Sequence, residues 1–314
     1  MTVGADALEL HGRLLDHRSR TDAYLKVVRA VVRPGDVVVD LGSGTGVFGV
    51  AAVRAGAARV YAIEASPMAR LVRRVAVANG VEQRMTVIRG WSQQVQLPER
   101  ADVIVSELIG NEPFAEGVLG TTADAVRRFL KPGGRLVPSG LRVLATPMQL
   151  PREVRRNAVI GPDRVRRWQE WYGIDFSPLP AFGPDGSAVA YVNPWEARDW
   201  KPLGPPTEVR DIELGLRPTR NKGPVSLPVD RPGRLDAVLL HFELRSGNRT
   251  FLSTAFDEVD QDNHWDSPVH YLRRPPAVGP RTALAVRYGP DGPGGPVSCA
   301  VLEHDGDGNW RALH

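Results

Sequence analysis

The sequence predicts an α/β domain followed by an all-β domain. Up to about Thr146, apolar strand-like runs alternate with segments whose apolar residues recur at helical spacing, as in a doubly wound parallel sheet. Beyond that point prolines and glycines become dense, the helical spacing fades, and short β-type runs alternate with turns. We therefore predict a first domain over residues 1–145 and a second domain over residues 146–314.

Each predicted element follows from a local pattern. Apolar residues between Leu8 and Val32 recur at helical spacing and are interrupted near residues 16–21, which indicates two short helices before the Pro34-Gly35 stop. The alternation that follows predicts strands at 37–41, 59–63, 85–89, 102–106 and 135–138 and helices at 47–55, 67–79 and 117–130. Lys131-Pro132-Gly133-Gly134 should end the last of these helices.

In the second domain, residues 237–243 and 283–288 are strand-like. The stretch 173–206 is rich in proline and tryptophan and is too long for an ordinary loop. Its pattern leaves three interpretations open: an arm, a lid or a disordered segment.

Composition narrows the function classes. The chain has 314 residues, and 40 Lys and Arg against 36 Asp and Glu give a net charge of +4, too small and too scattered to indicate nucleic-acid binding. A single cysteine, Cys299, excludes an internal disulfide framework and a cysteine-rich metal site, and favours a reducing cytoplasm. No metal-ligand pattern, signal peptide or stretch of roughly 18 apolar residues is visible, so we expect a cytoplasmic protein without metal or membrane contact.

A glycine turn after the first strand predicts a nucleoside-cofactor site. Gly42, Gly44 and Gly46 would let a ligand approach the backbone, and Glu64, at the end of the next strand, could accept hydrogen bonds from both ribose hydroxyls. A tight turn without a ligand is the alternative for the glycines alone. A dinucleotide fingerprint would need a third glycine at position 47, which is Val47. Asp40 and the acidic loop described next suit a cationic sulfonium, so S-adenosylmethionine fits better than a dinucleotide.

Two glutamates, Glu107 and Glu116, lie in the loop that follows the strand at 102–106. Two carboxylates at the edge of a sheet, next to a cofactor turn, can bind the N–H groups of a cation bidentately. The alternative is a pair of solvated loop charges.

Taken in order along the chain, these motifs resemble those of the protein arginine methyltransferases. The resemblance runs from about His11 to Tyr288. It rests on these segments: His11 with Leu14-Leu15 and Arg20-Thr21, Asp40 to Gly46, Glu64, Gly90-Trp91-Ser92-Gln93, the spaced Glu107 and Glu116, and Asn263-His264-Trp265. The spaced glutamates and the His-Trp pair are its most specific part.

The resemblance implies S-adenosylmethionine as the cofactor and assigns a role to each matched residue. It implies cofactor binding for His11, Arg20, Asp40, Gly42, Gly44, Gly46, Glu64 and Gln93, with Arg20 on the methionine carboxylate and Gln93 at the adenine amine. Glu107, Glu116 and His264 would be catalytic, and Trp265 would bind substrate. Taken singly, Arg20 also fits a solvated helix residue, His264 a structural cap or pair, and Trp265 barrel core.

The resemblance also implies an architecture: a Rossmann-like class I methyltransferase domain, a β-barrel domain, and an inserted dimerisation arm at about 173–205 that makes a homodimer. Tyr172-Gly173-Ile174-Asp175-Phe176 is similar to the sequence that enters that arm. The chain departs from the family in several places. Met1 to Leu10 contains no aromatic residue for a cofactor lid, His17 stands where the family has an aspartate, and Leu108 and Asn111 replace aromatic residues.

The predicted activity is S-adenosylmethionine-dependent methylation of a guanidino nitrogen of arginine, free or in a peptide or protein. Methylation of another small-molecule amine or hydroxyl, and a non-catalytic scaffold, are the alternatives. The net charge of +4 argues against attraction of basic protein tails, so we expect free arginine or a short peptide as acceptor. High arginine, alanine and proline usage is typical of proteins of GC-rich bacteria.

Overall fold

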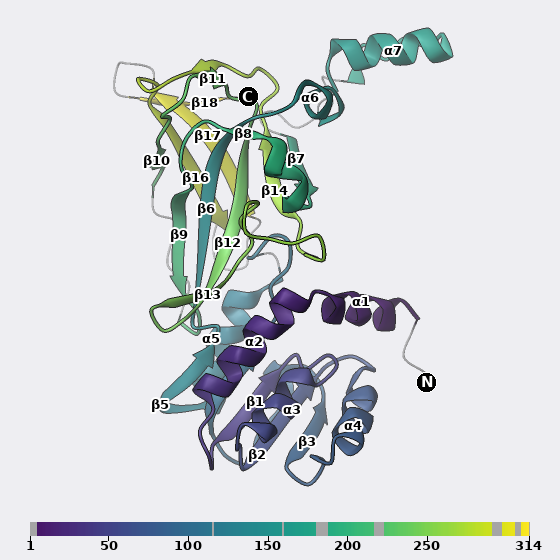
Figure 1. The fold of residues 1–314 in the computed structure, drawn as a ribbon, viewed down its shortest axis with the longest axis vertical. Coiled ribbons are helices and arrows are strands. Elements are labelled where there is room, and N and C mark those ends of the chain that lie inside the picture. Colours follow the sequence, from purple (N-terminus) through teal and green to yellow (C-terminus); the bar gives the residue numbers. More distant parts are fainter. Residues whose placement is uncertain are drawn as a thin grey trace.

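The computed structural model describes residues 5–114, 116–158, 160–179, 188–216, 223–290, 297–304 and 309–313. An α/β part lies at one end of the long axis and a β-rich part lies at the other (Figure 1). The predicted order of an α/β domain followed by a β domain is therefore confirmed.

The first sheet has five parallel strands in the order β3-β2-β1-β4-β5. The strands are β1 (Val37–Leu41), β2 (Arg59–Glu64), β3 (Met85–Arg89), β4 (Ala101–Ser106) and β5 (Leu130–Val137). All five residues of β1 are buried, as its largely apolar sequence predicts for a central strand. Chain order reverses between β1 and β4, and ligands of open α/β sheets bind at such a point, beyond the carboxyl ends of the strands.

Helices pack around this sheet much as the sequence predicts. They are α1 (Ala5–Asp16), α2 (Arg18–Val31), α3 (Val47–Arg54), α4 (Ala69–Ala78), the short η1 (Ser92–Gln94) and α5 (Val118–Phe129). The predicted break between the first two helices is confirmed and narrows to one residue, His17. The predicted stop at 131–134 lies inside β5 instead, where Gly133 takes a positive φ of 74° and the pairing with β4 shifts register.

The second part is built on two long antiparallel strands, β6 (Gly140–Gln149) and β12 (Ala237–Ser246), which pair from end to end. The predicted boundary between residues 145 and 146 falls inside β6. The other strands are β7 (Ala188–Val192), β8 (Lys201–Pro202), β9 (Thr207–Glu213), β10 (Val225–Leu227), β11 (Gly233–Arg234), β13 (Arg249–Ser253), β14 (Ser267–Tyr271), β15 (Ala277–Val278), β16 (Leu284–Pro290), β17 (Val297–His304) and β18 (Trp310–Ala312).

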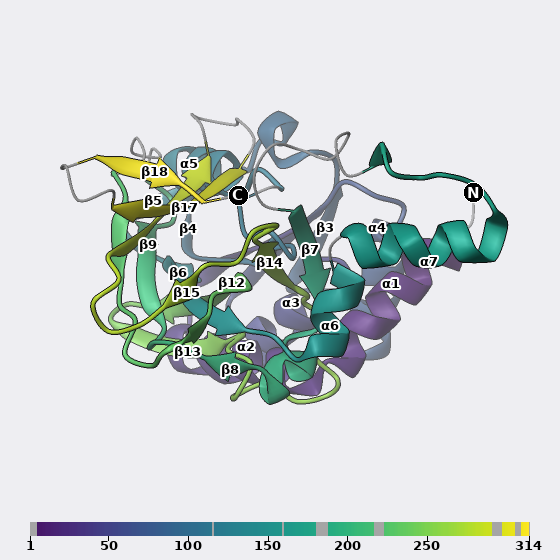
Figure 2. The ribbon, with the colours of Figure 1, turned by 90° about the horizontal axis from the view of Figure 1, so that it is seen from above.

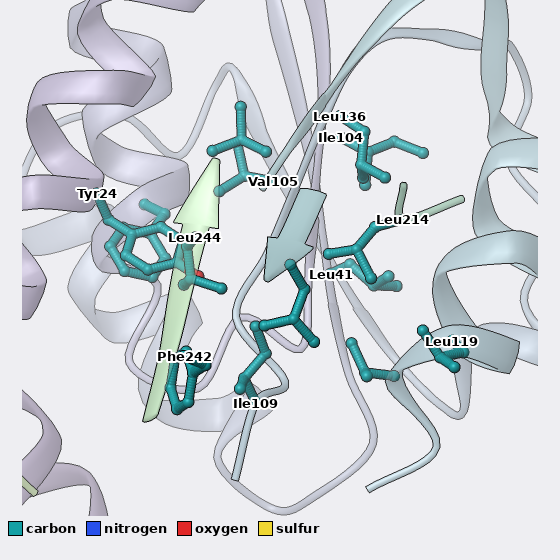
Figure 3. Close-up of a cluster of buried hydrophobic side chains, with 14 of the residues drawn as sticks. Tyr24, Leu41, Ile104, Val105, Ile109, Leu119, Leu136, Leu214, Phe242 and Leu244 are labelled. Atoms are coloured by element: carbon teal, nitrogen blue, oxygen red, sulfur yellow. The ribbon is translucent and has the colours of Figure 1, made fainter. Parts of the chain in front are cut away.

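One apolar core joins the two parts. Tyr24 of α2 stacks on Phe48 of α3 with ring centroids 5.0 Å apart and meets Phe251 of β13 edge-on at 5.2 Å. Figure 3 shows Tyr24 and Leu41 beside Phe242 and Leu244 of β12. Burial of large aromatic side chains across this junction stabilises it and fixes the sheet edge relative to the barrel.

The segment between β6 and β7 leaves the body of the molecule. It contains α6 (Arg152–Ala158) and α7 (Pro162–Tyr172), and α7 extends sideways beyond the strands (Figures 1 and 2). Of the predicted arm at 173–205, residues 180–187 lie outside the described residues, whereas β7 pairs with β14 and Trp200 is buried against the barrel. The helix that projects therefore precedes Gly173.

Candidate functional site

The glycine turn after β1 is approached closely from two sides. Gly42, Gly44 and Gly46 have φ values of 71°, 52° and 82°, in the left-handed region that favours glycine. A Cβ at Gly42 would lie 2.6 Å from Leu108 Cδ2, and one at Gly44 would lie 2.8 Å from His11 Cε1. The turn is thus a cradle into which side chains would not fit.

Two buried carboxylates fix this turn. Asp40 Oδ2 accepts from the Gly49 amide at 2.9 Å, and burial raises the pKa of Asp40 to about 7. Glu64, at the end of β2, accepts from the amides of Gly44 at 2.9 Å and Ser66 at 2.8 Å. Each Glu64 oxygen keeps a lone pair for a further donor, while its position is set by the backbone.

Arg20 is buried and pairs with a glutamate of the following loop. Its Nη2 donates to Glu107 Oε2, and its Nη1 donates to the Leu14 carbonyl at 3.1 Å. The guanidinium lies 5.6 Å from the ring centroid of Trp265. The alternative that Arg20 is a solvated helix residue is therefore wrong. Arg20, a predicted cofactor-binding residue, contacts Glu107, a predicted catalytic residue.

Glu116 lines a pocket together with Glu107. The pocket has a volume of about 640 Å³ and is lined by Glu107, Glu116, His264 and Trp265 among others. Desolvation raises the pKa of Glu116, and the charge of Glu107 adds to that effect. A Cβ at Gly110 would collide with Glu116 Oε1, so the glycine leaves room for this carboxylate.

Two histidines meet beside the pocket. His17 Nδ1 and His264 Nδ1 lie 2.7 Å apart, so one nitrogen donates and the other accepts. Desolvation first, and then the nearby Arg20 charge, lower the pKa of His17 to about 4 and that of His264 to about 3. Asp16 is exposed, and His264 pairs with His17.

The barrel loop that carries His264 is tied to the glutamate loop. Trp265 is 1% exposed, and its Nε1 donates to the Ile109 carbonyl at 2.7 Å. Asn111 Oδ1 accepts from the Asp266 amide at 3.0 Å. Trp265 is therefore core and pocket wall at once. The contact of Asn111 with the barrel loop was not predicted from the sequence. The signal for it was the polar side chain of Asn111 at a position where the family has an aromatic residue.

A smaller pocket of about 60 Å³ connects the turn to this site. His11, Arg20, Gly42, Gly44 and Glu107 line it, so the structure brings these predicted residues together. Gln93 is not part of either pocket. It is exposed and donates to Thr121 Oγ1 at 3.4 Å.

Four histidines with lowered pKa values, three of them buried and His264 half-buried, predict loss of stability in acid. Burial lowers the pKa of His241 and His270 to about 4, as it does for His17 and His264 at the site. Each is neutral in the fold and protonated in the unfolded chain below pH 6.5, so stability should fall as the pH drops from about 6.5 to about 4. For His270 the shift corresponds to about 3 kcal/mol.

Denaturant titrations at several pH values would measure this slope, and His270→Leu should reduce it. Asp40 opposes the trend, because its raised pKa contributes stability that is present at low pH and lost as the pH rises toward 7. A free energy of unfolding that is constant or increases from pH 6.5 to 4 would contradict the prediction.

No described helix is both long and apolar enough to cross a bilayer. In the part of the chain that the structure describes, no group of three or more His, Cys, Asp and Glu residues is arranged to hold a metal ion.

Sequence comparisons place the chain among known methyltransferases. Residues 16–176 match the family model described as ribosomal protein L11 methyltransferase (PrmA). Protein arginine N-methyltransferase 6 of Xenopus tropicalis is 33% identical over 279 residues, covering 84% of this chain and 78% of the relative. Probable protein arginine N-methyltransferase 6 of Arabidopsis thaliana is 34% identical over 172 residues, covering 54% of this chain. The chain covers only 38% of the length of that plant relative.

Solved structures share the fold of this chain. The Trypanosoma brucei PRMT1 enzyme-prozyme heterotetrameric complex with AdoHcy has a TM-score of 0.79 at 20% identity and covers 97% of this chain and 96% of its own. Arabidopsis thaliana protein arginine methyltransferase 10 has a TM-score of 0.74 at 21% identity, covering 96% and 95%. These relatives come from a frog, a plant and a trypanosome, so the bacterial character suggested by composition is not confirmed.

Proposed function

Because the chain belongs to the protein arginine N-methyltransferase family, we propose that it transfers a methyl group from S-adenosylmethionine to a guanidino nitrogen of arginine. The observation that carries this proposal is the pocket that Glu107 and Glu116 both line, together with His264 and Trp265, next to the glycine turn. Two carboxylates around one cavity match the fork of N–H donors on a guanidinium.

The residues around the turn fit the cofactor. The Gly42-to-Gly46 cradle admits a ligand where a Cβ would collide, and Glu64 is oriented to accept from ribose hydroxyls. Arg20 Nε is a buried donor without a partner in the described structure, which suits the methionine carboxylate. When bound, the cofactor supplies an electrophilic methyl group on a cationic sulfonium. Asp40 would contribute to cofactor binding indirectly, because its carboxylate accepts from the Gly49 amide and so holds the start of α3 in place.

The two glutamates would divide the work on the substrate. Arg20 and the Ile109 amide, which donates to Oε1 at 3.3 Å, hold Glu107 in place as an acceptor for guanidinium N–H groups. Methylation requires the product nitrogen to lose a proton. Glu116 is the better acceptor of that proton, because its raised pKa makes it a stronger base than an ordinary carboxylate.

His264 has a different role in this proposal. With its pKa lowered to about 3, it is neutral at physiological pH and is a weaker base than Glu116. Its contact with His17 and the anchoring of Trp265 on Ile109 instead position the barrel loop against the substrate pocket. We therefore assign His264 to positioning and Glu116 to proton transfer.

Isotope-labelled S-adenosylmethionine with free arginine, an arginine tripeptide and a histone-tail peptide, followed by mass spectrometry of the products, tests the activity. Methylation of other amines or hydroxyls but not of arginine would overturn the proposal. We expect the small acceptors to be preferred, because a net charge of +4 does not attract basic tails. A kcat/KM about a hundredfold higher for the histone tail, about 2.7 kcal/mol in transition-state binding, would reject that preference.

We further propose that two copies associate through α7. Trp171, Tyr172 and Ile174 at its end are 61%, 62% and 55% exposed, which is costly for large apolar side chains that cluster together. An apolar groove of about 310 Å³ between α2, α3 and α4, lined by Leu25, Val50 and other residues, offers a receptor of matching character on the partner.

The dimer prediction is tested by a charge placed in this contact. Trp171→Glu should convert a dimer to monomers by static light scattering, because burial of the new carboxylate would cost several kcal/mol. Trp91→Glu is the matched control, since Trp91 is 65% exposed on the methyltransferase domain and outside the groove. A wild-type chain that is monomeric at micromolar concentration would contradict the proposed dimer.

A cytoplasmic location also belongs to this proposal. Its support is the single free cysteine, Cys299, whose thiol pKa burial raises to about 12 and which is therefore a poor redox nucleophile. Fractionation of cells that express the protein with a C-terminal tag would test it, and recovery in a secreted fraction would contradict it.

A further inference from the structure

A second polar cavity lies far from the methylation site, at the base of α7. Its volume is about 510 Å³, and its walls come from α6, the start of α7, β11 and the segment after β14. Six arginines line it: Arg152, Arg155, Arg156, Arg164, Arg234 and Arg273. It shares no lining residue with the pocket of the glutamates.

The positive charge of this cavity is poorly compensated. Asp236 is fully buried and accepts from Arg234 at 2.7 and 3.1 Å, from the Leu150 amide at 2.9 Å, and lies 3.5 Å from Arg155 Nε. The negative charge of Asp236 is therefore paired with Arg155 and Arg234. The acidic residue that lines the cavity, Asp163, pairs with Arg166 outside it.

Three further guanidiniums of the cavity have no carboxylate at ion-pair distance among the described residues. They are Arg152, Arg156 and Arg164. Arg164 donates to the Asn157 carbonyl at 2.8 Å and lies 5.0 Å from the ring centroid of Trp168, so packing holds it at the cavity wall. Like charges gathered in this way repel one another unless an anion lies between them.

Arg155 provides an independent sign of a missing partner. Its Nη2 donates to the Arg273 carbonyl at 3.0 Å, while its Nη1 is buried and has no hydrogen-bond partner in the described structure. A buried donor left without a partner costs free energy, and an absent ligand is one physical reason for it. Because its other nitrogens are fixed, the guanidinium is preorganised to donate.

The N-terminus of α7 adds to the positive electrostatic potential of the cavity. Gly161 and Pro162 line the cavity, and the N-cap of α7 has no side-chain acceptor. Backbone dipoles place partial positive charge at this end of the helix, which favours anions and is partly offset by Asp163 in the first turn.

We propose that this cavity binds a phosphate group, from inorganic phosphate or pyrophosphate or from a nucleotide. Phosphate concentrates two or more negative charges on oxygens that guanidinium forks bind bidentately, which suits several arginines around one space. The volume exceeds the needs of a single orthophosphate and leaves room for a second phosphate or a nucleoside. Side chains of an acidic peptide carry single charges spaced along a chain and match the cluster less well.

Binding would tie the base of α7 to the barrel. Arg152, Arg155 and Arg156 belong to α6, and Arg164 belongs to α7. Arg234 is part of β11. An anion held by both groups at once stabilises the folded arrangement by mass action, so the melting temperature should rise with its concentration.

Calorimetric titration of the full chain with orthophosphate, pyrophosphate and AMP at constant ionic strength tests the proposal. We expect saturable binding of at least one of them, with an affinity at least tenfold lower in the double variant Arg152→Ala/Arg156→Ala. The matched control is Arg74→Ala/Arg287→Ala, which removes two exposed arginines outside the cavity and should leave the affinity unchanged. Arg155 is left intact, because its loss would leave buried Asp236 less compensated.

Unchanged S-adenosylmethionine binding in both double variants will show that they are folded. The arms of the titration distinguish the sources: AMP tighter than orthophosphate indicates a nucleotide, and pyrophosphate tighter than AMP indicates an inorganic anion. No binding at millimolar concentration, equal affinity in the cavity and control variants, or equal binding of a polyglutamate peptide would each overturn the proposal.

Discussion

Glu107→Gln should abolish methyl transfer while cofactor binding stays nearly intact. The isosteric amide keeps the shape of the side chain but loses the charge that binds a guanidinium in a partly desolvated pocket. Loss of one charge-assisted partner there should cost roughly 3–5 kcal/mol in the transition state, on the order of a hundred- to several-thousandfold in rate. Glu116→Gln should have a similar effect, because the amide also removes the proposed proton acceptor.

Steady-state kinetics on the best acceptor and calorimetric binding of S-adenosylmethionine measure the two effects separately. Glu99→Gln is the matched control, since Glu99 pairs with Arg59 at the surface, outside the pocket. Near wild-type rates for both Glu107→Gln and Glu116→Gln would show that the guanidinium clamp is wrong. Loss of cofactor binding in Glu107→Gln would instead indicate that Glu107 acts mainly through Arg20.

Local patterns predicted the first domain well. The strand at 37–41 is β1 with the same bounds, and the strand at 85–89 is β3, because short, largely apolar runs followed by glycine favour strands. The glycine turn could be predicted too, since three positive φ angles in a short segment favour glycine.

The contacts that define the site were beyond such reasoning. Arg20 binds Glu107, His17 meets His264, and Trp265 anchors on Ile109, and each pair is far apart in sequence. Which partners meet depends on how the barrel docks on the sheet edge, and that is set by packing of Tyr24 and Phe251 across the junction. Local periodicity carries no information about such packing.

The same limit applies to α7. The proline- and tryptophan-rich stretch marked an unusual segment, yet the projecting helix is Pro162–Tyr172, which precedes it. Pro162 at the first turn and Gly173 at the end, with φ of 65°, are ordinary helix boundaries and could have been read as such. Val165, Trp168 and Trp171 recur at helical spacing in this helix, but such a pattern does not tell whether the apolar residues pack on the body or project from it.

His17→Asp should raise the pKa of His264 by two units or more, about 3 kcal/mol. In the wild type, desolvation and the Arg20 charge lower that pKa to about 3, and the neighbouring imidazole, 2.7 Å away, offers no negative charge to oppose them. A carboxylate at position 17 would favour the protonated ring. NMR titration of the His264 ring protons measures the shift, and His17→Asn is the control that changes size without charge.

The substitution should also change activity with pH in a way that a structural effect would not. Below its new pKa His264 is protonated, and its positive charge beside the pocket should repel a guanidinium, so KM for the acceptor should rise as the pH falls through that pKa and recover above it. His17→Asn should leave KM independent of pH in that range, because its His264 stays neutral. A His264 pKa that stays near its wild-type value in His17→Asp would show that desolvation outweighs a directly bonded carboxylate, and that the histidine pair is held neutral by burial alone.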